Sequence, residues 1–238
     1  RQRQMCIRDR IYYESQFEEA TIELLREAHW QYTFGDDIHR KYTDPLIEED
    51  LRNFLAAQYK DRDLTTSEID GIVANLRNTG GQNDYYALRN AFLLYRDGYD
   101  FAYSDGRDNP FRLEYIDFEH PDHNIFRCVN QFVMEQGREN RRPDILLFVN
   151  GIPVCIIELK NPTKQNATIR DAHTQICTRY MRDIPALLKY CALAVISDGA
   201  KNALGTIYTP FEFFYEWKKI ENEDKAGKGL DTLRTLIR

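Results

Sequence analysis

Two apolar runs joined by the dipeptide Asn150-Gly151 limit most strongly how this chain can fold. The runs, 144–149 and 153–160, consist mainly of aliphatic residues, which favour strands buried on both faces. Asn-Gly is a typical two-residue turn between antiparallel strands, because both residues tolerate a positive φ. The segment is therefore predicted to be a β-hairpin inside a sheet.

The spacing of apolar residues changes along the chain. From residue 15 to about residue 100 they recur at helical steps, and Asp44-Pro45 and Thr65-Thr66-Ser67-Glu68 are typical helix starts. Beyond residue 110 the pattern becomes that of strands, with helices expected over 169–176 and 211–218. The strands outside the hairpin are expected over 112–118, 126–135, 192–197 and 204–208. The sequence thus predicts an α+β fold of the α/β/α type, with a helical N-terminal part followed by a central mixed β-sheet flanked by helices.

The same patterns give the expected domain limits. Residues 1–14 show neither period and are expected to be a disordered or non-native leader. Residues 15–220 are expected to form one domain, with 15–100 mainly helical and 110–210 carrying the sheet. Residues 221–238 are expected to be a linker.

Composition excludes several classes of protein. No apolar run approaches the roughly 18 residues of a membrane span, and the net charge of −6 argues against bulk electrostatic coating of nucleic acid. The five cysteines lack C-x-x-C spacing and lie in apolar surroundings. Reduced, buried thiols are therefore expected, as is typical of a cytoplasmic protein.

Three charged residues stand at the ends of the predicted hairpin strands. Glu158 and Lys160 project from one face, because residues two apart on a strand share a face. A strict two-residue loop would pair residue 144 with 157 and turn Asp144 away, whereas a three-residue loop would pair it with 156 and unite all three charges. Pro153 cannot donate to a regular ladder, so we predict an odd-length loop or a bulge.

The predicted cluster has the chemistry of a metal site. Two neighbouring carboxylates repel each other unless a cation lies between them. Oxygen ligands favour Mg²⁺, with Mn²⁺ as a substitute, so Asp144 and Glu158 are the predicted ligands, with the Leu159 backbone carbonyl as a further oxygen. Lys160 could orient or help deprotonate a water and offset charge on phosphate. The pattern points to hydrolysis of a phosphodiester.

At this point the sequence resembles a known family. Pro143-Asp144 followed by Glu158-Leu159-Lys160 fits the PD-(D/E)xK nuclease signature. The longer runs 141–153 and 157–162 resemble the N-terminal nuclease domain of type I restriction enzyme R subunits, and the resemblance extends from residue 15 to the C-terminus. It implies a restriction-endonuclease-like core over 110–210 and a Mg²⁺-dependent type I site-specific deoxyribonuclease. Such an endonuclease cuts double-stranded DNA in defence against foreign DNA.

The resemblance also implies partners. In that family the nuclease is fused to an ATP-driven DNA translocase and works with methylation and specificity subunits. The chain contains no G-x-x-x-x-G-K-[S/T] run, so ATP is expected to act only in a motor absent from this chain. Residues 221–238 would then lead toward that motor.

A second family motif departs from its usual spacing. The family carries Gln-x-x-x-Tyr on the helix after the lysine, whereas Gln175 and Tyr180 are one residue further apart. On an ideal α-helix Arg179, and not Tyr180, shares the face of Gln175. Either Arg179 takes the place of the tyrosine or a π-bulge brings Tyr180 round. Gln175 is predicted to position the substrate or the lysine.

Other polar residues near the predicted site are weaker candidates. Glu18 or Glu19 on the first helix could add a carboxylate, although a solvated helix face is the simpler explanation for either. Eight Lys/Arg and four Asp/Glu lie between 138 and 182, which suits phosphate contacts. His120 and His123 form a pair, but no third ligand is evident, so we expect no zinc site there. The predicted phosphate contacts are Arg141, Arg142 and Lys164.

Two other functions fit the same residues. The fold could be a non-catalytic docking module of the restriction complex, in which the carboxylates are structural. It could also be the nuclease domain of another helicase-linked defence or repair enzyme. Carboxylate-dependent metal binding would distinguish the first alternative, and the motor that follows residue 238 would distinguish the second.

Overall fold

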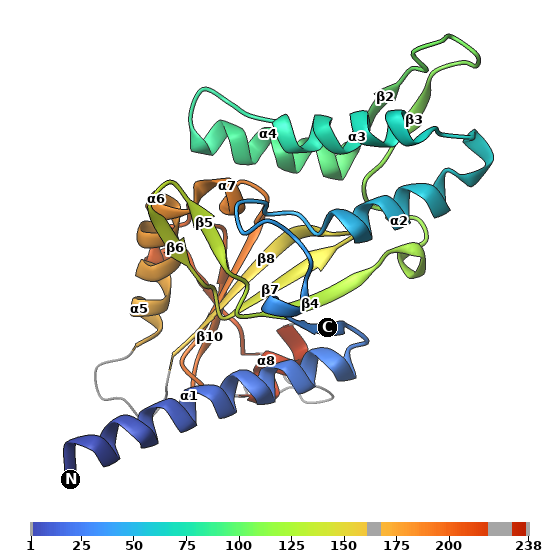
Figure 1. Ribbon diagram of the computed structural model, residues 1–238. Helices are drawn as coiled ribbons and strands as arrows, with labels where there is room; N and C mark the ends of the chain where they lie inside the picture. Colours follow the sequence, from blue (N-terminus) through green and yellow to red (C-terminus); the bar gives the residue numbers. More distant parts are fainter. Residues whose placement is uncertain (1, 161–167, 219–229, 237–238) are drawn as a thin grey trace.

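A mixed sheet forms the centre of the molecule in the computed structural model, which describes residues 2–160, 168–218 and 230–236 (Figure 1). Two of its neighbouring strand pairs are parallel, β1 with β4 and β8 with β9, and the others are antiparallel. The predicted α+β fold is confirmed. In spatial order the strands are β1 (Gln31–Phe34), β4 (Phe126–Asn130), β7 (Ile145–Val149), β8 (Ile152–Leu159), β9 (Leu193–Ser197), β10 (Asn202–Gly205) and β11 (Tyr215–Glu216).

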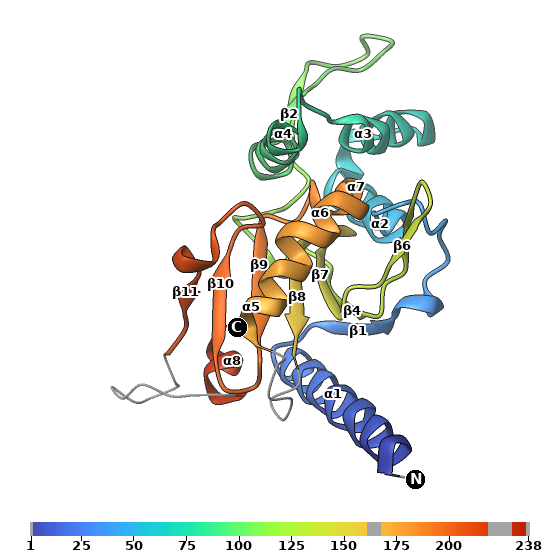
Figure 2. The ribbon, with the colours of Figure 1, turned by 90° about the vertical axis from the view of Figure 1, so that its left-hand side faces the viewer.

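Helices cover both faces of this sheet. On one face α5 continues directly into a π-helix, α6 and α7, and Figure 2 shows α5 in front of β8 and β9. On the other face lie α1 and α8. These helices are α1 (Gln2–Glu27), α5 (Ile169–Thr174), the π-helix (Gln175–Tyr180), α6 (Met181–Asp183), α7 (Pro185–Leu188) and α8 (Leu230–Leu236).

Alternation along the strands builds a core on each face. Leu146 of β7 packs in the cluster that includes Ile176 of the π-helix. Its neighbour Ile145 packs in the cluster that includes Leu25 of α1. Because successive side chains of a strand point to opposite faces, even-numbered positions of β7 face the π-helix. Asp144 precedes this strand with the same parity, which directs it toward that face.

A helical unit covers one end of the sheet. Its core joins Leu51, Ile72 and Ala91, one from each of α2, α3 and α4, to Val149 and Ile152 beside the hairpin turn. The unit therefore lies at the turn end of β7 and β8, at the top of Figure 1. The opposite end, where β7 begins and β8 ends, is left for the charged residues. The elements of the unit are α2 (Glu48–Gln58), α3 (Thr66–Asn78), α4 (Asp84–Asp97) and the hairpin of β2 (Tyr99–Phe101) and β3 (Phe111–Leu113). Outside the unit, β5 (Met134–Gln136) and β6 (Glu139–Arg141) form a second small hairpin.

Local sequence signals explain most helix ends. The side chain of Thr65 and that of Glu68 bond reciprocally to each other's backbone, so the predicted capping box starts α3. The helix expected at Pro45 instead starts at Glu48. Asp44 accepts a hydrogen bond from the amide of Leu46 at 3.1 Å, which stabilises a turn before the helix rather than its first residue.

Two expectations about the secondary structure need correction, those for residues 31–34 and 211–218. Helix α1 spans Gln2–Glu27, and the expectation that residues 1–14 are a disordered or non-native leader stays a prediction. The mainly helical part contains the unexpected strand β1. The helix expected over 211–218 is a short 3₁₀ turn followed by β11. Of the expected linker, 221–229 and 237–238 lie outside the described residues, but α8 packs on the sheet through the buried Leu233.

Candidate active site

The hairpin between β7 and β8 sets the register of the site. Asn150 and Gly151 have φ values of 51° and 76°, and Val149 pairs with Ile152, so the loop has two residues. A register shift past Leu147 then inserts one extra residue into β8, and Ile145 pairs with Ile157. The next step along this register brings Asp144 opposite Glu158 on one face. Of the two predicted alternatives, the bulge is confirmed, whereas the odd-length loop and its pairing of 144 with 156 are wrong.

Buried contacts fix this turn. The Asn150 side chain accepts a hydrogen bond from the amide of Ile125 at 2.7 Å and donates to the carbonyl of Tyr115 at 2.9 Å. A Cβ atom on Gly151 would lie 2.1 Å from the carbonyl oxygen of Ile47. Only glycine tolerates both this close approach and the positive φ. The turn sequence therefore fixes the pairing of Val149 with Ile152, from which the bulge shifts the register toward the site.

Four of the predicted residues lie together where β8 ends. The Lys160 ammonium donates to Glu158 Oε1 at 2.7 Å and to Gln175 Oε1 at 2.9 Å. The backbone amide of Leu159 donates to Asp144 Oδ2 at 2.8 Å. The structure thus brings together Asp144, Glu158, Lys160 and Gln175.

Glu158 is the most unusual group in this cluster. The residue is fully buried, and its second oxygen, Oε2, has no hydrogen-bond partner in the part of the chain that the structure describes. Burial raises the pKa of this carboxyl well above its ordinary value, the nearby Asp144 raises it further, and Lys160 only partly opposes both. A buried carboxylate oxygen without a partner suits a cation as its missing ligand.

The π-helix decides between the two candidates for the family tyrosine. Its wider turn is marked by the amide of Met181 bonding to the carbonyl of Ile176 five residues earlier. As a result the Gln175 amide donates to the Tyr180 hydroxyl at 2.7 Å. Tyr180 is buried, whereas Arg179 is exposed. Tyr180, and not Arg179, therefore lies beside Gln175.

Glu18 approaches the same strand ends from α1. Its carboxylate accepts hydrogen bonds from the side-chain amides of Asn130 at 2.7 Å and Gln131 at 2.9 Å. Gln131 also donates its backbone amide to the carbonyl of Asp144 at 3.0 Å. Glu18 is thus held next to the site through Gln131. The contacts of Asn130 and Gln131 with Glu18 could not be predicted, because nothing in the sequence signals the positive φ of Gln131.

The predicted phosphate contacts differ in their surroundings. Arg141 pairs with the buried carboxylate of Asp183 at 2.7 Å and also with Glu139, so its guanidinium is engaged within the fold. Arg142 is exposed next to the site. Lys164 lies outside the described residues. A DNA contact by any of these three stays a prediction, as does a ligand role for the Leu159 carbonyl.

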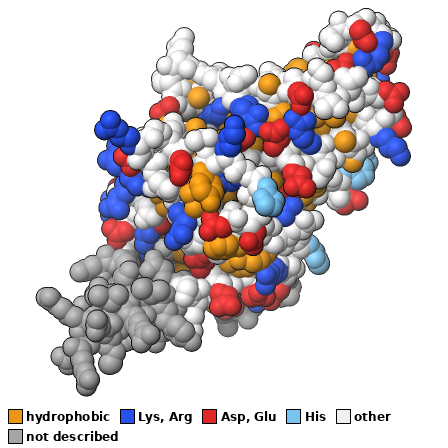
Figure 3. Space-filling model, viewed as in Figure 1, with side chains coloured by type: hydrophobic (Ala, Val, Ile, Leu, Met, Phe, Trp, Pro, Cys, Tyr) orange, Lys and Arg blue, Asp and Glu red, His pale blue; other side chains and the backbone are white. Residues whose placement is uncertain are grey.

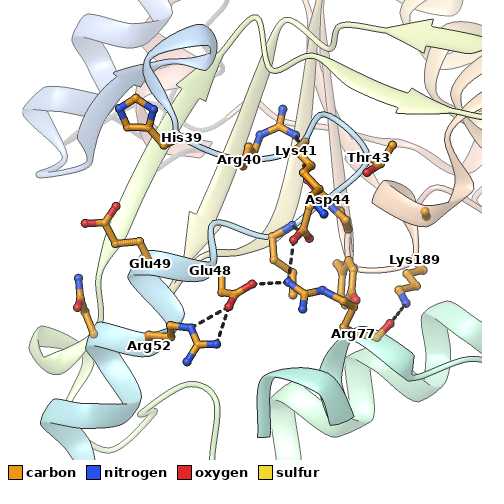
Figure 4. A pocket seen from close by; sticks show the side chains of 15 residues that line it. His39, Arg40, Lys41, Thr43, Asp44, Glu48, Glu49, Arg52, Arg77 and Lys189 are labelled. Carbon is orange, nitrogen blue, oxygen red and sulfur yellow. Dashed lines mark hydrogen bonds and ion pairs between the residues drawn. The ribbon is translucent and has the colours of Figure 1, made fainter. Parts of the chain in front are cut away.

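A separate charged cavity of about 840 Å³ lies between α2, the segment before it and α7 (Figure 4). Two of its cations are bound by neighbours within the cavity: Arg77 bridges Asp44 and Glu48, and Lys189 donates to the carbonyl of Arg77. None of the clustered residues at the end of β8 lines it.

The surface facing the viewer in Figure 3 mixes acidic and basic side chains. Within the described residues, no helix is both long and apolar enough to cross a membrane.

Comparison with known proteins identifies the family of the chain. Residues 11–213 match the family model of the type I restriction enzyme R protein N terminus. The chain is 28% identical to the HindI type I restriction enzyme endonuclease subunit of Haemophilus influenzae over 94% of the chain and 22% of that protein. It is 29% identical to a putative MjaIXP endonuclease subunit of Methanocaldococcus jannaschii over 87% of the chain and 20% of that protein.

The chain thus spans about a fifth of the length of these curated relatives. Its family match covers the whole helical unit and every strand of the sheet except β11. The chain therefore belongs to the family of type I restriction enzyme R protein N-terminal domains.

Proposed function

We propose that this domain cleaves phosphodiester bonds of double-stranded DNA with Mg²⁺ at Asp144 and Glu158. The observation that carries the proposal is the state of Glu158, a buried carboxylate with one oxygen bound by Lys160 and the other without a partner among the described residues. A purely structural carboxylate at such depth would be expected to have both oxygens satisfied. When bound, Mg²⁺ would supply positive charge to the phosphate and to an attacking water.

The protein side chains then have distinct roles. The amide of Leu159 orients the Asp144 carboxylate, and burial keeps bulk water from screening the charge of Glu158. Lys160 is held between Glu158 and Gln175, where its ammonium can orient a water or offset negative charge on the phosphate. Tyr180 fixes the Gln175 amide and through it the position of Lys160.

The proposed setting is a type I restriction enzyme. The chain would be the nuclease domain of a type I site-specific deoxyribonuclease whose ATP-driven motor lies in another part of the full-length subunit. Methylation and specificity subunits are the proposed protein partners, and the cytoplasm is the proposed location. The family membership and the names of the relatives, which are endonuclease subunits, support this setting.

The test is DNA cleavage by the full-length subunit assembled with its partners. Asp144→Ala, Glu158→Ala and Lys160→Ala should each abolish cleavage while ATP hydrolysis continues. Lys201→Ala, which changes an exposed lysine outside the cluster, serves as the matched control and should cut normally. Cleavage at the wild-type rate by any of the three site variants would contradict the proposal. Loss of assembly in those variants would instead favour a docking module.

A further inference from the structure

A second group of metal-binding side chains lies outside the nuclease site. Between β3 and β4, a loop over residues 117–124 brings together the carboxylate of Asp117 and the rings of His120 and His123. One ligand atom from each residue lies within 4.8 Å of the others. Among the described residues no other group of at least three such side chains is as closely gathered. The expectation that no third candidate ligand lies near the histidines is therefore wrong, because the Asp117 carboxylate lies close to both.

The distances suit tetrahedral coordination. Asp117 Oδ2 lies 3.0 Å from His123 Nδ1 and 3.6 Å from His120 Nδ1. Zn²⁺ bonds of about 2.0–2.1 Å in a tetrahedral site place neighbouring ligand atoms ~3.3 Å apart. A single hydrogen bond would account for His123 alone. It does not account for His120, whose Nδ1 lies near the same oxygen but beyond hydrogen-bond distance, as an ion pair if the ring is protonated.

The two imidazole rings are arranged as a pair. They stack with centroids 4.9 Å apart and planes 18° from parallel. Their side chains are 61% and 51% exposed, which leaves room for an ion from solvent. From residue 114 to residue 124 the chain carries four acidic residues and neither Lys nor Arg. The local charge therefore favours a cation.

Asp117 is already held in a fixed orientation. Its Oδ1 accepts the backbone amides of Glu119 and His120 at 3.0 and 2.8 Å. Its Oδ2 also accepts the side-chain amide of Gln58 from α2 at 2.9 Å. Such outer contacts fix the orientation of a ligand before the ion arrives. They also connect the loop to the helical unit.

The loop is joined to the turn of the catalytic hairpin as well. Asn124 donates to the carbonyl of Asp117 at 2.7 Å and accepts from the side-chain amide of Asn150 at 2.8 Å. An ion in the loop would therefore tie α2 to the β7–β8 turn. That turn lies at the opposite end of the hairpin from Glu158, so such an ion would support the fold rather than the chemistry.

We propose that Asp117, His120 and His123 bind one zinc-type divalent cation, with water completing the shell. Imidazole nitrogens select Zn²⁺, Co²⁺ or Ni²⁺ over Mg²⁺, so this site differs in ligand chemistry from the all-oxygen nuclease site. The ion stabilises the junction between the helical unit and the sheet. This inference is independent of the proposed nuclease activity.

The test is a titration of the tag-free chain with Co²⁺ followed by visible absorption, and with Zn²⁺ followed by calorimetry. The wild type should bind one ion with the intense absorption of a four-coordinate Co²⁺ site. His120→Asn and His123→Asn should weaken binding at least about tenfold. His29→Asn, which removes an exposed histidine elsewhere, is the matched control and should bind as the wild type does.

A second readout is thermal unfolding. Zn²⁺ at a hundred times its dissociation constant should raise the midpoint temperature of unfolding of the wild type by ~5–10 °C. The same Zn²⁺ concentration should raise the midpoint temperature of His120→Asn much less. His120 is the more informative change, because its exposed ring can be lost with little effect on folding. Equal binding by the two histidine variants and the wild type would overturn the proposal. No Zn²⁺ or Co²⁺ binding by the folded wild type would overturn it equally.

Discussion

Glu158 is expected to destabilise the metal-free protein, and its replacement by glutamine tests this directly. The buried carboxylate has one oxygen without a partner among the described residues, and it lies close enough to Asp144 for that group to raise its pKa. Glutamine has the shape of the protonated side chain and carries no charge. Glu158→Gln should therefore raise the stability of the metal-free chain while abolishing its metal site.

The size and pH dependence of this effect follow from burial. Leaving a buried polar atom unsatisfied costs about 1–3 kcal/mol, which corresponds to ~2–10 °C in the midpoint of a domain of this size. Because the folded-state pKa of Glu158 lies above the ordinary 4.5, the fold binds this proton more tightly than the unfolded chain does. Stability from this group is present below about pH 4.5 and is lost as the pH rises through the folded pKa.

The assay is urea unfolding in EDTA across pH 5 to 9. The difference in unfolding free energy between Glu158→Gln and the wild type should grow as the pH rises. Glu19→Gln, at an exposed carboxylate, should show no such change. Adding Mn²⁺ should stabilise the wild type and not Glu158→Gln. A variant that is less stable than the wild type by the same amount at every pH would refute the reasoning.

Three further predictions concern the surroundings of the site. Tyr180→Phe removes the hydroxyl that Gln175 contacts and should slow cleavage by the full-length enzyme roughly 5–10-fold. Because Tyr180 is not a ligand, the Mn²⁺ affinity of this variant, measured by calorimetry, should stay within about twofold of the wild type. Arg107 and the amide of Thr65 lower the pKa of Glu68 to about 2. The unfolding free energy of the wild type should therefore fall as the pH drops from about 4.5 toward 2, and that of Glu68→Gln should lack this loss. Asn150→Ala removes several buried hydrogen bonds and places alanine at a residue with positive φ. It should lower the unfolding free energy, measured with a denaturant, by roughly 2–4 kcal/mol.

The sheet centre and the acidic pair could be predicted because their signals are local. Asn150-Gly151 specifies a tight turn, and Pro153 disfavours a regular ladder beside it. Together these residues predicted an odd-length loop or a bulge, and the bulge places Asp144 and Glu158 on one face. The position of that bulge could not be predicted, because it depends on which side chains the two cores accept.

Other features depended on distant contacts that the sequence does not display. Tyr180 rather than Arg179 lies beside Gln175, because a π-helix can bury the aromatic ring and leave the guanidinium in water. Strand β11 replaces the expected helix, since its Glu216 pairs with Ala203 of β10. The place of Glu18 beside the site likewise depends on Asn130 and Gln131, more than a hundred residues away in the chain.

Binding of Mn²⁺ to the two carboxylates tests the central claim most directly. Calorimetric titration of the chain is compared with that of the Asp144→Ala/Glu158→Ala double variant, both checked for folding by circular dichroism. The site described above predicts saturable binding of Mn²⁺ to the wild type and its loss in the double variant. Equal binding to both proteins, or no binding to the folded wild type in the presence of DNA, would contradict it.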